Sequence, residues 1–179
     1  MKERKGPEFV ALLTNGAAGD INNHDVSRPS PVRQPGEQIQ RVAGWIAAQV
    51  DEQWANAEFH HDVPIASHQT LYDQGVRKPV GDEIDAARKQ WEDESLPRVD
   101  RSYGRERLLL LEWPDAVPMV VQTIRVGGFA AATMTGEIFC RHGLDLKHAS
   151  PFPVTALIEL ANGYGGYVPT MVDYQLGSY

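Results

Sequence analysis

The sequence predicts an α/β fold in which helices cover a mixed β-sheet, with an α+β arrangement as the alternative. Apolar runs of strand length alternate along the chain with segments that have helical periodicity. The dipeptide Gly127-Gly128 interrupts this alternation with a hairpin signal, which adds an antiparallel strand pair. No segment has the composition of an interdomain linker, so we expect residues 1–179 to form a single unit.

The composition excludes several classes of protein. Hydrophobic residues make up 42% of the chain and charged residues 23%, which is typical of a globular protein. The net charge of −7, without a basic stripe and interleaved aromatic residues, argues against nucleic-acid binding. A single cysteine excludes an intramolecular disulfide and a cysteine-based zinc site. No apolar run approaches the length of a transmembrane helix.

The first half of the chain is predicted to contain two strands and two helices. The run EFVALLT, residues 8–14, is apolar and reads as a buried strand. Apolar residues recur at three- and four-residue steps over residues 37–58, which predicts an amphipathic helix. Residues 63–72 are expected to form a strand. Residues 82–94 are expected to form a helix whose first turn is acidic, as the helix dipole favours.

The second half is predicted to contain a hairpin, a helix and a further strand. A short helix over residues 108–111 precedes strands over 117–126 and 129–133, which the Gly-Gly turn joins. A helix is expected over residues 137–148, opened by Thr135 or Gly136. The apolar residues 154–160 then predict one more strand.

The turn after the first predicted strand is a candidate site. Strand exits that carry glycine, aspartate and asparagine often hold ligands. Asp20 can bind a metal or orient a metal ligand, and Asn22 can donate a hydrogen bond to an oxyanion. The alternative is that these residues only satisfy the preferences of a turn. Neither a GxGxxG motif nor a phosphate-binding lysine pattern is present, so a nucleotide site is not indicated.

Glu137 and the C-terminal tyrosines form two further candidates. Glu137 is an anionic ligand suited to a metal at a predicted helix N-terminus, or an ordinary carboxylate that the helix dipole favours. Tyr164, Tyr167, Tyr174 and Tyr179 lie among glycines and prolines. They either form a wall whose phenol oxygens face a cavity, or they pack within a loop.

The remaining chemical candidates are weak. The six histidines form no HxH, HxxxH or HExxH pattern, so each is predicted to be a surface or packing residue. The serines show no nucleophile elbow, which argues against a serine triad. Cys140 is predicted to be an inert residue within a helix.

Three segments, taken in order, resemble the neutral (alkaline, non-lysosomal) ceramidase family. FVALLTNGAAGDINNHD resembles the family's strand followed by Gly-Asp-Val-Ser-Pro-Asn. RVGGFAAATMTGEIF resembles its strand followed by Pro-Gly-Glu-Phe. IELANGYGGYVPTMVDYQLGSY resembles its Asn-x-Tyr-x-x-Tyr-Val-Thr-Thr segment and the tyrosine that closes it. The three matches span nearly the whole chain.

The resemblance implies a role for five residues of a zinc-dependent amide hydrolase. Glu137 matches the family's zinc-binding glutamate, and Tyr167 matches its zinc-binding tyrosine. Tyr179 matches a tyrosine that helps to stabilise the oxyanion of the attacked amide, and Gly19 and Asp20 match the Gly-Asp that opens the hexapeptide. Asn22 stands where the family has serine and can donate a hydrogen bond, but it has no hydroxyl group.

The resemblance also implies that the chain is the second half of a catalytic domain. The missing N-terminal half would supply the two zinc histidines, so one zinc ion with an incomplete shell is expected here, without activity of the chain alone. The implied substrate is a small-molecule or lipid amide such as a sphingolipid. The localisation stays open, and a secreted or periplasmic parent is one alternative. The alternative is a non-catalytic relative, or one with a non-lipid substrate, in which Asn22 replaces the serine.

Overall fold

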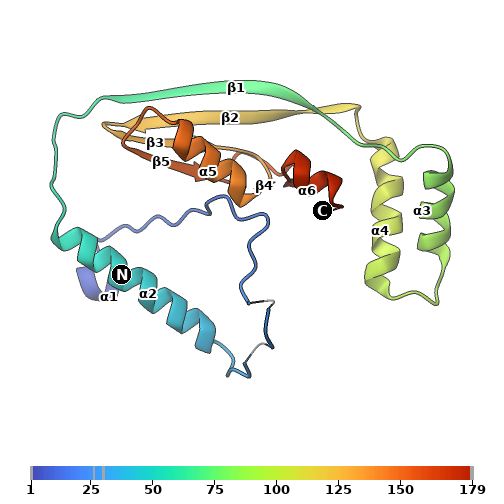
Figure 1. Cartoon of the computed structure of the whole chain (residues 1–179), viewed down its shortest axis with the longest axis horizontal. Coiled ribbons are helices and arrows are strands. Elements are labelled where there is room, and N and C mark those ends of the chain that lie inside the picture. The colour runs from blue at the N-terminus through green and yellow to red at the C-terminus, as the bar shows by residue number, and fades with distance from the viewer. Residues whose placement is uncertain (1, 26, 30, 178–179) are drawn as a thin grey trace. The chain divides into compact units, whose positions relative to one another are not determined.

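The computed structural model describes residues 2–25, 27–29 and 31–177 and has an α/β fold with a mixed sheet (Figure 1). Four strands form the main sheet in the order β1-β2-β3-β5, and two short strands, β4 and β6, form a second ladder. The predicted fold class is therefore confirmed. Contacts divide the chain into two compact groups. One comprises the residues up to His68 together with those from Gln122 onward, and the other comprises Gln69–Val121.

The main sheet is built around the predicted hairpin. Strands β2 (Ala116–Val126) and β3 (Phe129–Thr133) are antiparallel, and Val126 pairs with Phe129 across the Gly-Gly turn. Strand β5 (Val154–Ile158) is parallel to β3 on its other side. Strand β1 (Ile65–Gly75) completes the sheet beside β2. These strands confirm the predictions for this part of the chain.

Two helical predictions are confirmed and one is too short. Helix α2 spans Glu37–Ala55 and helix α3 spans Asp82–Glu92, close to the predicted ranges. Helix α4 runs from Arg98 to Leu109 and continues as a 3-10 turn over Leu110–Glu112. The predicted helix at 108–111 is therefore only the end of a longer element, which packs against α3.

Residues 8–14 do not form the predicted strand. The segment is irregular, and its side chains are exposed: Val10 is 77% and Leu12 91% accessible. An apolar run becomes a strand only where a neighbouring strand satisfies its backbone groups. The chain first meets the sheet region at Asn15, whose carbonyl accepts a 3.2 Å hydrogen bond from the N–H of Glu159, the residue that follows β5.

Glu137 lies in a strand and not at the start of a helix, so the predicted helix over 137–148 begins too early. Strand β4 (Glu137–Ile138) pairs in parallel with β6 (Tyr167–Val168), and helix α5 begins only at Cys140 and ends at Ala149. The Glu137 N–H donates to the Gly166 carbonyl at 2.8 Å. This tertiary pairing overrides the helical reading of the local sequence, and it places Cys140 at the helix start.

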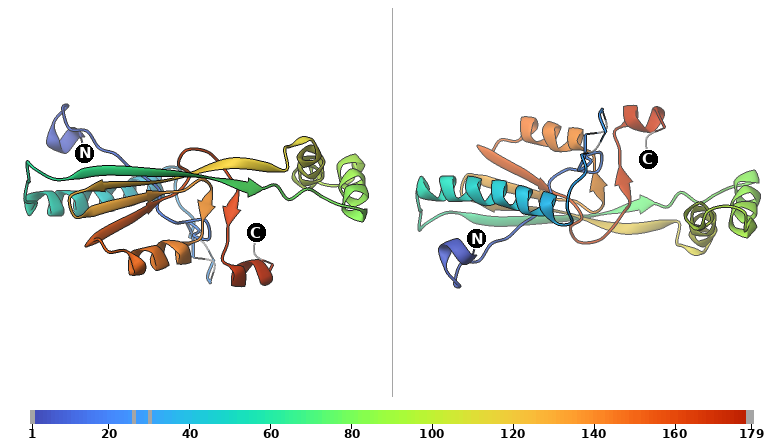
Figure 2. Two further views of the ribbon diagram at one scale, coloured as in Figure 1. Left: turned by 90° about the horizontal axis from the view of Figure 1, so that it is seen from above. Right: turned by 90° about the horizontal axis from the view of Figure 1, so that it is seen from below.

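The buried core includes residues of β4 and of the main sheet. Ile138 and Phe139 are the largest fully buried side chains among the described residues, and Leu157 of β5 is also buried. Helix α5 packs against β5 (Figure 2). Two short helices, α1 (Lys2–Lys5) and α6 (Met171–Gln175), lie near the two ends of the described chain. No helix of the described residues is long and apolar enough to cross a membrane.

The close packing of α3 on α4 depends on Gly104. A Cβ at this position would lie 2.6 Å from the Ala87 carbonyl oxygen and 2.8 Å from the Trp91 nitrogen. Gly104→Ala is therefore expected to lower the free energy of unfolding by about 1–3 kcal/mol, because two helix backbones must separate. Gly44→Ala in α2 is the matched control, since nothing lies within 4 Å of its Cβ position. Denaturant unfolding should show Gly44→Ala neutral or stabilising by up to about 1 kcal/mol. Equal effects of the two changes would contradict the packing argument.

Candidate functional site

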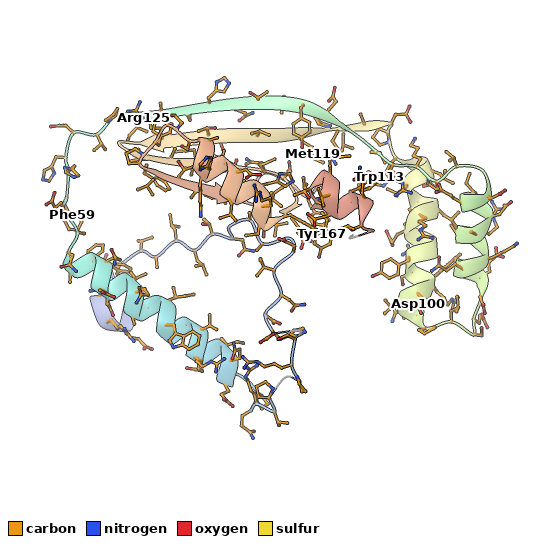
Figure 3. All side chains as sticks on the ribbon, viewed as in Figure 1. Phe59, Asp100, Trp113, Met119, Arg125 and Tyr167 are labelled. Carbon is orange, nitrogen blue, oxygen red and sulfur yellow. The ribbon has the colours of Figure 1, made fainter. Side chains whose placement is uncertain are left out.

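The second ladder brings two of the predicted site residues side by side. In the parallel pairing of β4 with β6, Glu137 is the register partner of Tyr167. Tyr167 is labelled in Figure 3. Neighbouring strands lie about 4.8 Å apart, and paired residues point to the same face. Glu137 is half-buried and Tyr167 is 40% exposed, so both side chains can reach a ligand at the surface.

A third side chain, Tyr164, joins this pair. Its hydroxyl donates a 3.1 Å hydrogen bond to Oε1 of Glu137. Loss of hydration raises the pKa of the Tyr164 phenol, and the hydrogen bond to Glu137 and the negative charge of that carboxylate raise it further. The sequence grouped Tyr164 with the other tyrosines but gave it no separate role; its spacing of three residues before Tyr167 was the available signal.

A buried carboxylate that the sequence reasoning missed holds the site together. Glu159 is 6% exposed, and its Oε2 accepts hydrogen bonds from the backbone N–H groups of Ala18 at 3.2 Å and Ile138 at 2.8 Å. The carboxylate therefore ties the turn after residue 15 to strand β4. A lone glutamate at the end of the apolar run VTALI was the only sequence signal.

The turn that carries Asp20 lies directly against β4. The Gly19 N–H donates to the Ile138 carbonyl at 2.8 Å. A Cβ on Gly19 would lie 2.5 Å from the Glu137 carbonyl oxygen, so only glycine fits. Asp20 Oδ1 accepts a 2.6 Å hydrogen bond from the Cys140 N–H at the start of α5. The contact that the structure gives Asp20 is thus that of a carboxylate capping a helix N-terminus.

Two other predicted residues are not brought into the Glu137–Tyr167 pair by the described contacts. Asn22 is exposed, and its Oδ1 accepts a 2.7 Å hydrogen bond from the Asn23 N–H in the same turn. Tyr179 lies outside the described residues, so its predicted role as an oxyanion donor stays a prediction.

The oxygen donors of the site are the Glu137 carboxylate and the phenols of Tyr164 and Tyr167. Zinc in catalytic sites takes three protein ligands and a water. Within residues 2–25, 27–29 and 31–177, no group of three or more His, Cys, Asp or Glu side chains is placed to hold a metal ion. The Glu137 carboxylate and the Tyr167 phenol are of the chemical type that can bind a metal ion, but two donors are fewer than a catalytic zinc site takes.

No protein-family model matches the chain, and no curated protein matches it.

The hydrogen bonds that Glu159 accepts from the Ala18 and Ile138 N–H groups, here called the Glu159 clamp, give a prediction about stability. Glu159→Ala removes the acceptor of one buried N–H group, that of Ile138, and of one half-buried N–H group, that of Ala18, and is expected to lower the free energy of unfolding by about 2–4 kcal/mol. Glu159→Gln keeps one oxygen at the site and should lose about half as much. Glu94→Ala is the control, because Glu94 is exposed. Thermal and denaturant unfolding measure the three variants, and equal stability of Glu159→Ala and Glu94→Ala would exclude the clamp.

The Tyr164–Glu137 hydrogen bond gives a prediction about titration. Tyr164 is expected to ionise above its ordinary value of 10.0, and Glu137→Gln should shift this ionisation downward because the carboxylate charge is removed. Since the folded state holds the phenol proton more tightly than the unfolded state, this contribution to stability is fully present below pH 10.0 and is lost as the pH rises through the raised pKa. Ultraviolet absorbance of phenolate measures the titration, with Tyr164→Phe to assign the step. An unchanged titration in Glu137→Gln would disprove the coupling.

Proposed function

We propose that the chain forms part of a ceramidase-like, zinc-dependent hydrolase that cleaves an N-acyl amide bond, with Glu137 and Tyr167 as metal ligands. The observation that supports this proposal is the β4–β6 register, in which these two residues are direct partners. They are far apart in the sequence, and each stands in a segment that resembles a family motif.

The donor chemistry is compatible with zinc but is incomplete. A carboxylate and a phenol oxygen are both anionic or ionisable oxygen donors, and two such ligands bind zinc weakly. The remaining ligands would come from another polypeptide segment, for which the resemblance suggests two histidines. The chain alone is therefore expected to be inactive.

Each residue of the site then has a definite task. A bound zinc ion would supply an activated water for attack on the amide carbonyl. Tyr164 holds one oxygen of Glu137 and so fixes the orientation of the carboxylate, as partners of metal ligands commonly do. Asn22 uses its carbonyl oxygen within the turn, so its amide NH2 is the group that would donate to an oxyanion. Tyr179 would be the second donor.

One observation favours a second candidate, a non-catalytic or non-lipid-substrate relative of the same fold. Asn22 stands in the position of the family's serine, and it is exposed and hydrogen-bonded within its own turn. An amide cannot act as a hydroxyl nucleophile. A comparison of N-acyl lipids with small amides as substrates of the zinc-loaded full parent separates the two candidates.

Zinc titration of the chain tests the metal assignment. Weak binding is expected, with a change in tyrosine absorbance as the Tyr167 phenol coordinates. Glu137→Gln and Tyr167→Phe should each weaken binding at least about tenfold, which corresponds to the loss of about 1.4 kcal/mol from one ligand. Glu94→Gln and Tyr103→Phe are the matched controls. Both control residues are exposed.

The same substitutions in the full parent test the activity. Glu137→Gln should abolish both zinc occupancy and hydrolysis of an N-acyl amide. Unchanged zinc occupancy in Glu137→Gln would disprove the metal assignment. Retained occupancy in the parent without hydrolysis of any N-acyl amide would favour the non-catalytic candidate.

A further inference from the structure

An open apolar trough lies between the extended segment of residues 9–13 and helix α2, in a part of the chain that the proposed metal site does not use. Its volume is about 870 Å³, within the range of small-ligand sites. None of the described residues that line it is charged. Twelve of the fourteen lining residues are apolar, and the two polar ones are Asn23 and Gln38.

The walls of this trough are apolar side chains that the fold leaves uncovered. Helix α2 has no buried residue, although Ile39, Val42, Ile46 and Val50 follow one face at helical spacing. Ile39 is 74% exposed, and Leu13 on the opposite wall is 83% exposed. Exposed apolar surface of this extent in a globular protein marks a binding site.

A basic pocket adjoins the trough, since the two cavities share two lining residues. Asn23 and Gln38 also line a second cavity, of about 460 Å³, together with three arginines, one histidine and one aspartate: Arg28, Arg33, Arg41, His24 and Asp25. Asp25 pairs with Arg28 at 2.9 Å. The described residues that line the pocket thus carry the positive charges of three arginines against the negative charge of Asp25, in a chain whose net charge is −7.

Arg41 is held at the junction of the two cavities. It lies three residues after Gln38 on α2, and its Nη2 donates a 2.6 Å hydrogen bond to Gln38 Oε1. Its guanidinium also lies over the ring of Trp45 at 5.0 Å. A positive charge is thus fixed where the apolar trough ends.

We propose that the trough and the pocket together bind a single-chain amphiphile with an anionic head group, specifically a monomeric long-chain carboxylate. The chain occupies the uncharged trough, and the carboxylate pairs with Arg33 and Arg41. Arginine favours this partner because its planar fork matches the two oxygens of a carboxylate. The proposal does not rest on the metal site.

The charges of α2 argue against a membrane surface as the occupant. Helices that lie on anionic bilayers are rich in Lys and Arg on their polar face. Helix α2 carries Arg41 against Glu37, Asp51 and Glu52, a balance of one positive and three negative charges. Its apolar residues also form one wall of a concave trough and not a convex face.

The full chain is titrated with palmitate at concentrations below those at which palmitate forms micelles. Binding is measured by calorimetry and by tryptophan fluorescence, because Trp54 lines the trough. Saturable binding of one palmitate is expected. Arg33→Gln/Arg41→Gln should weaken it about tenfold, and added salt should weaken it as well. Ile46→Asp, on the opposite part of the site, should also abolish binding. Arg88→Gln and Arg105→Gln, in the α3–α4 pair, are the control substitutions. Circular dichroism verifies that each variant keeps its helices.

Four outcomes would overturn the proposal. These are the absence of saturable binding, equal affinity for palmitate and its neutral methyl ester, and binding only to vesicles that contain anionic phospholipid. The fourth is self-association of the chain, measured by sedimentation, together with loss of palmitate binding at the concentrations at which the chain self-associates. A tenfold preference for palmitate over the ester, lost in the double arginine variant and retained in the controls, would support it.

Discussion

The candidate site depends on the buried carboxylate of Glu159. A carboxylate removed from water is tolerated only when strong hydrogen bonds replace its hydration, and here two backbone N–H groups do so. One donor, Ala18, belongs to an early turn, and the other, Ile138, belongs to β4. The carboxylate therefore joins three segments that are distant in the sequence, because Glu159 itself follows β5. Without it, the turn would be joined to the region of β4 by the Gly19–Ile138 hydrogen bond and by the contact of Asp20 with the Cys140 N–H.

The loop between β5 and β6 completes the arrangement. Leu160 and Asn162 both have positive φ angles, 55° and 65°, which are uncommon for residues with a side chain. Hydrogen bonds to residues in and just after β3 hold the loop in this shape. The Leu160 N–H donates to the Gly136 carbonyl at 3.0 Å, and the Asn162 side chain donates to Thr133 at 3.2 Å. This tight reversal brings β6 back alongside β4, so that Tyr164 and Tyr167 both lie next to Glu137. The strain belongs to the segment that positions the site, which is where such conformations gather.

Sequence reasoning succeeded where the signal was local. The Gly-Gly hairpin and the periodic helix α2 could be predicted because turn chemistry and helical spacing lie within a few residues. It failed for Glu137, because a two-residue strand is defined by a partner, β6, that lies far along the chain. It failed for residues 8–14 because an apolar run favours a buried strand but does not show whether a neighbouring strand is present to pair with it. Glu159 was missed because a buried glutamate and an exposed one look alike in a sequence.

Each of the two proposed ligands would stabilise the folded chain, although the two proposed sites are built differently. The metal site is fixed by backbone pairing between β4 and β6, whereas the trough is made of apolar side chains on a helix that buries none of them. An amphipathic helix gains most of its stability from covering its apolar face. Whatever binds only the folded state stabilises it by mass action, so a long-chain carboxylate in the trough would stabilise α2 in proportion to its occupancy. A metal ion at Glu137 and Tyr167 would instead stabilise the β4–β6 ladder. The two effects fall on separate segments, and the stability of each segment therefore reports on one ligand independently of the other.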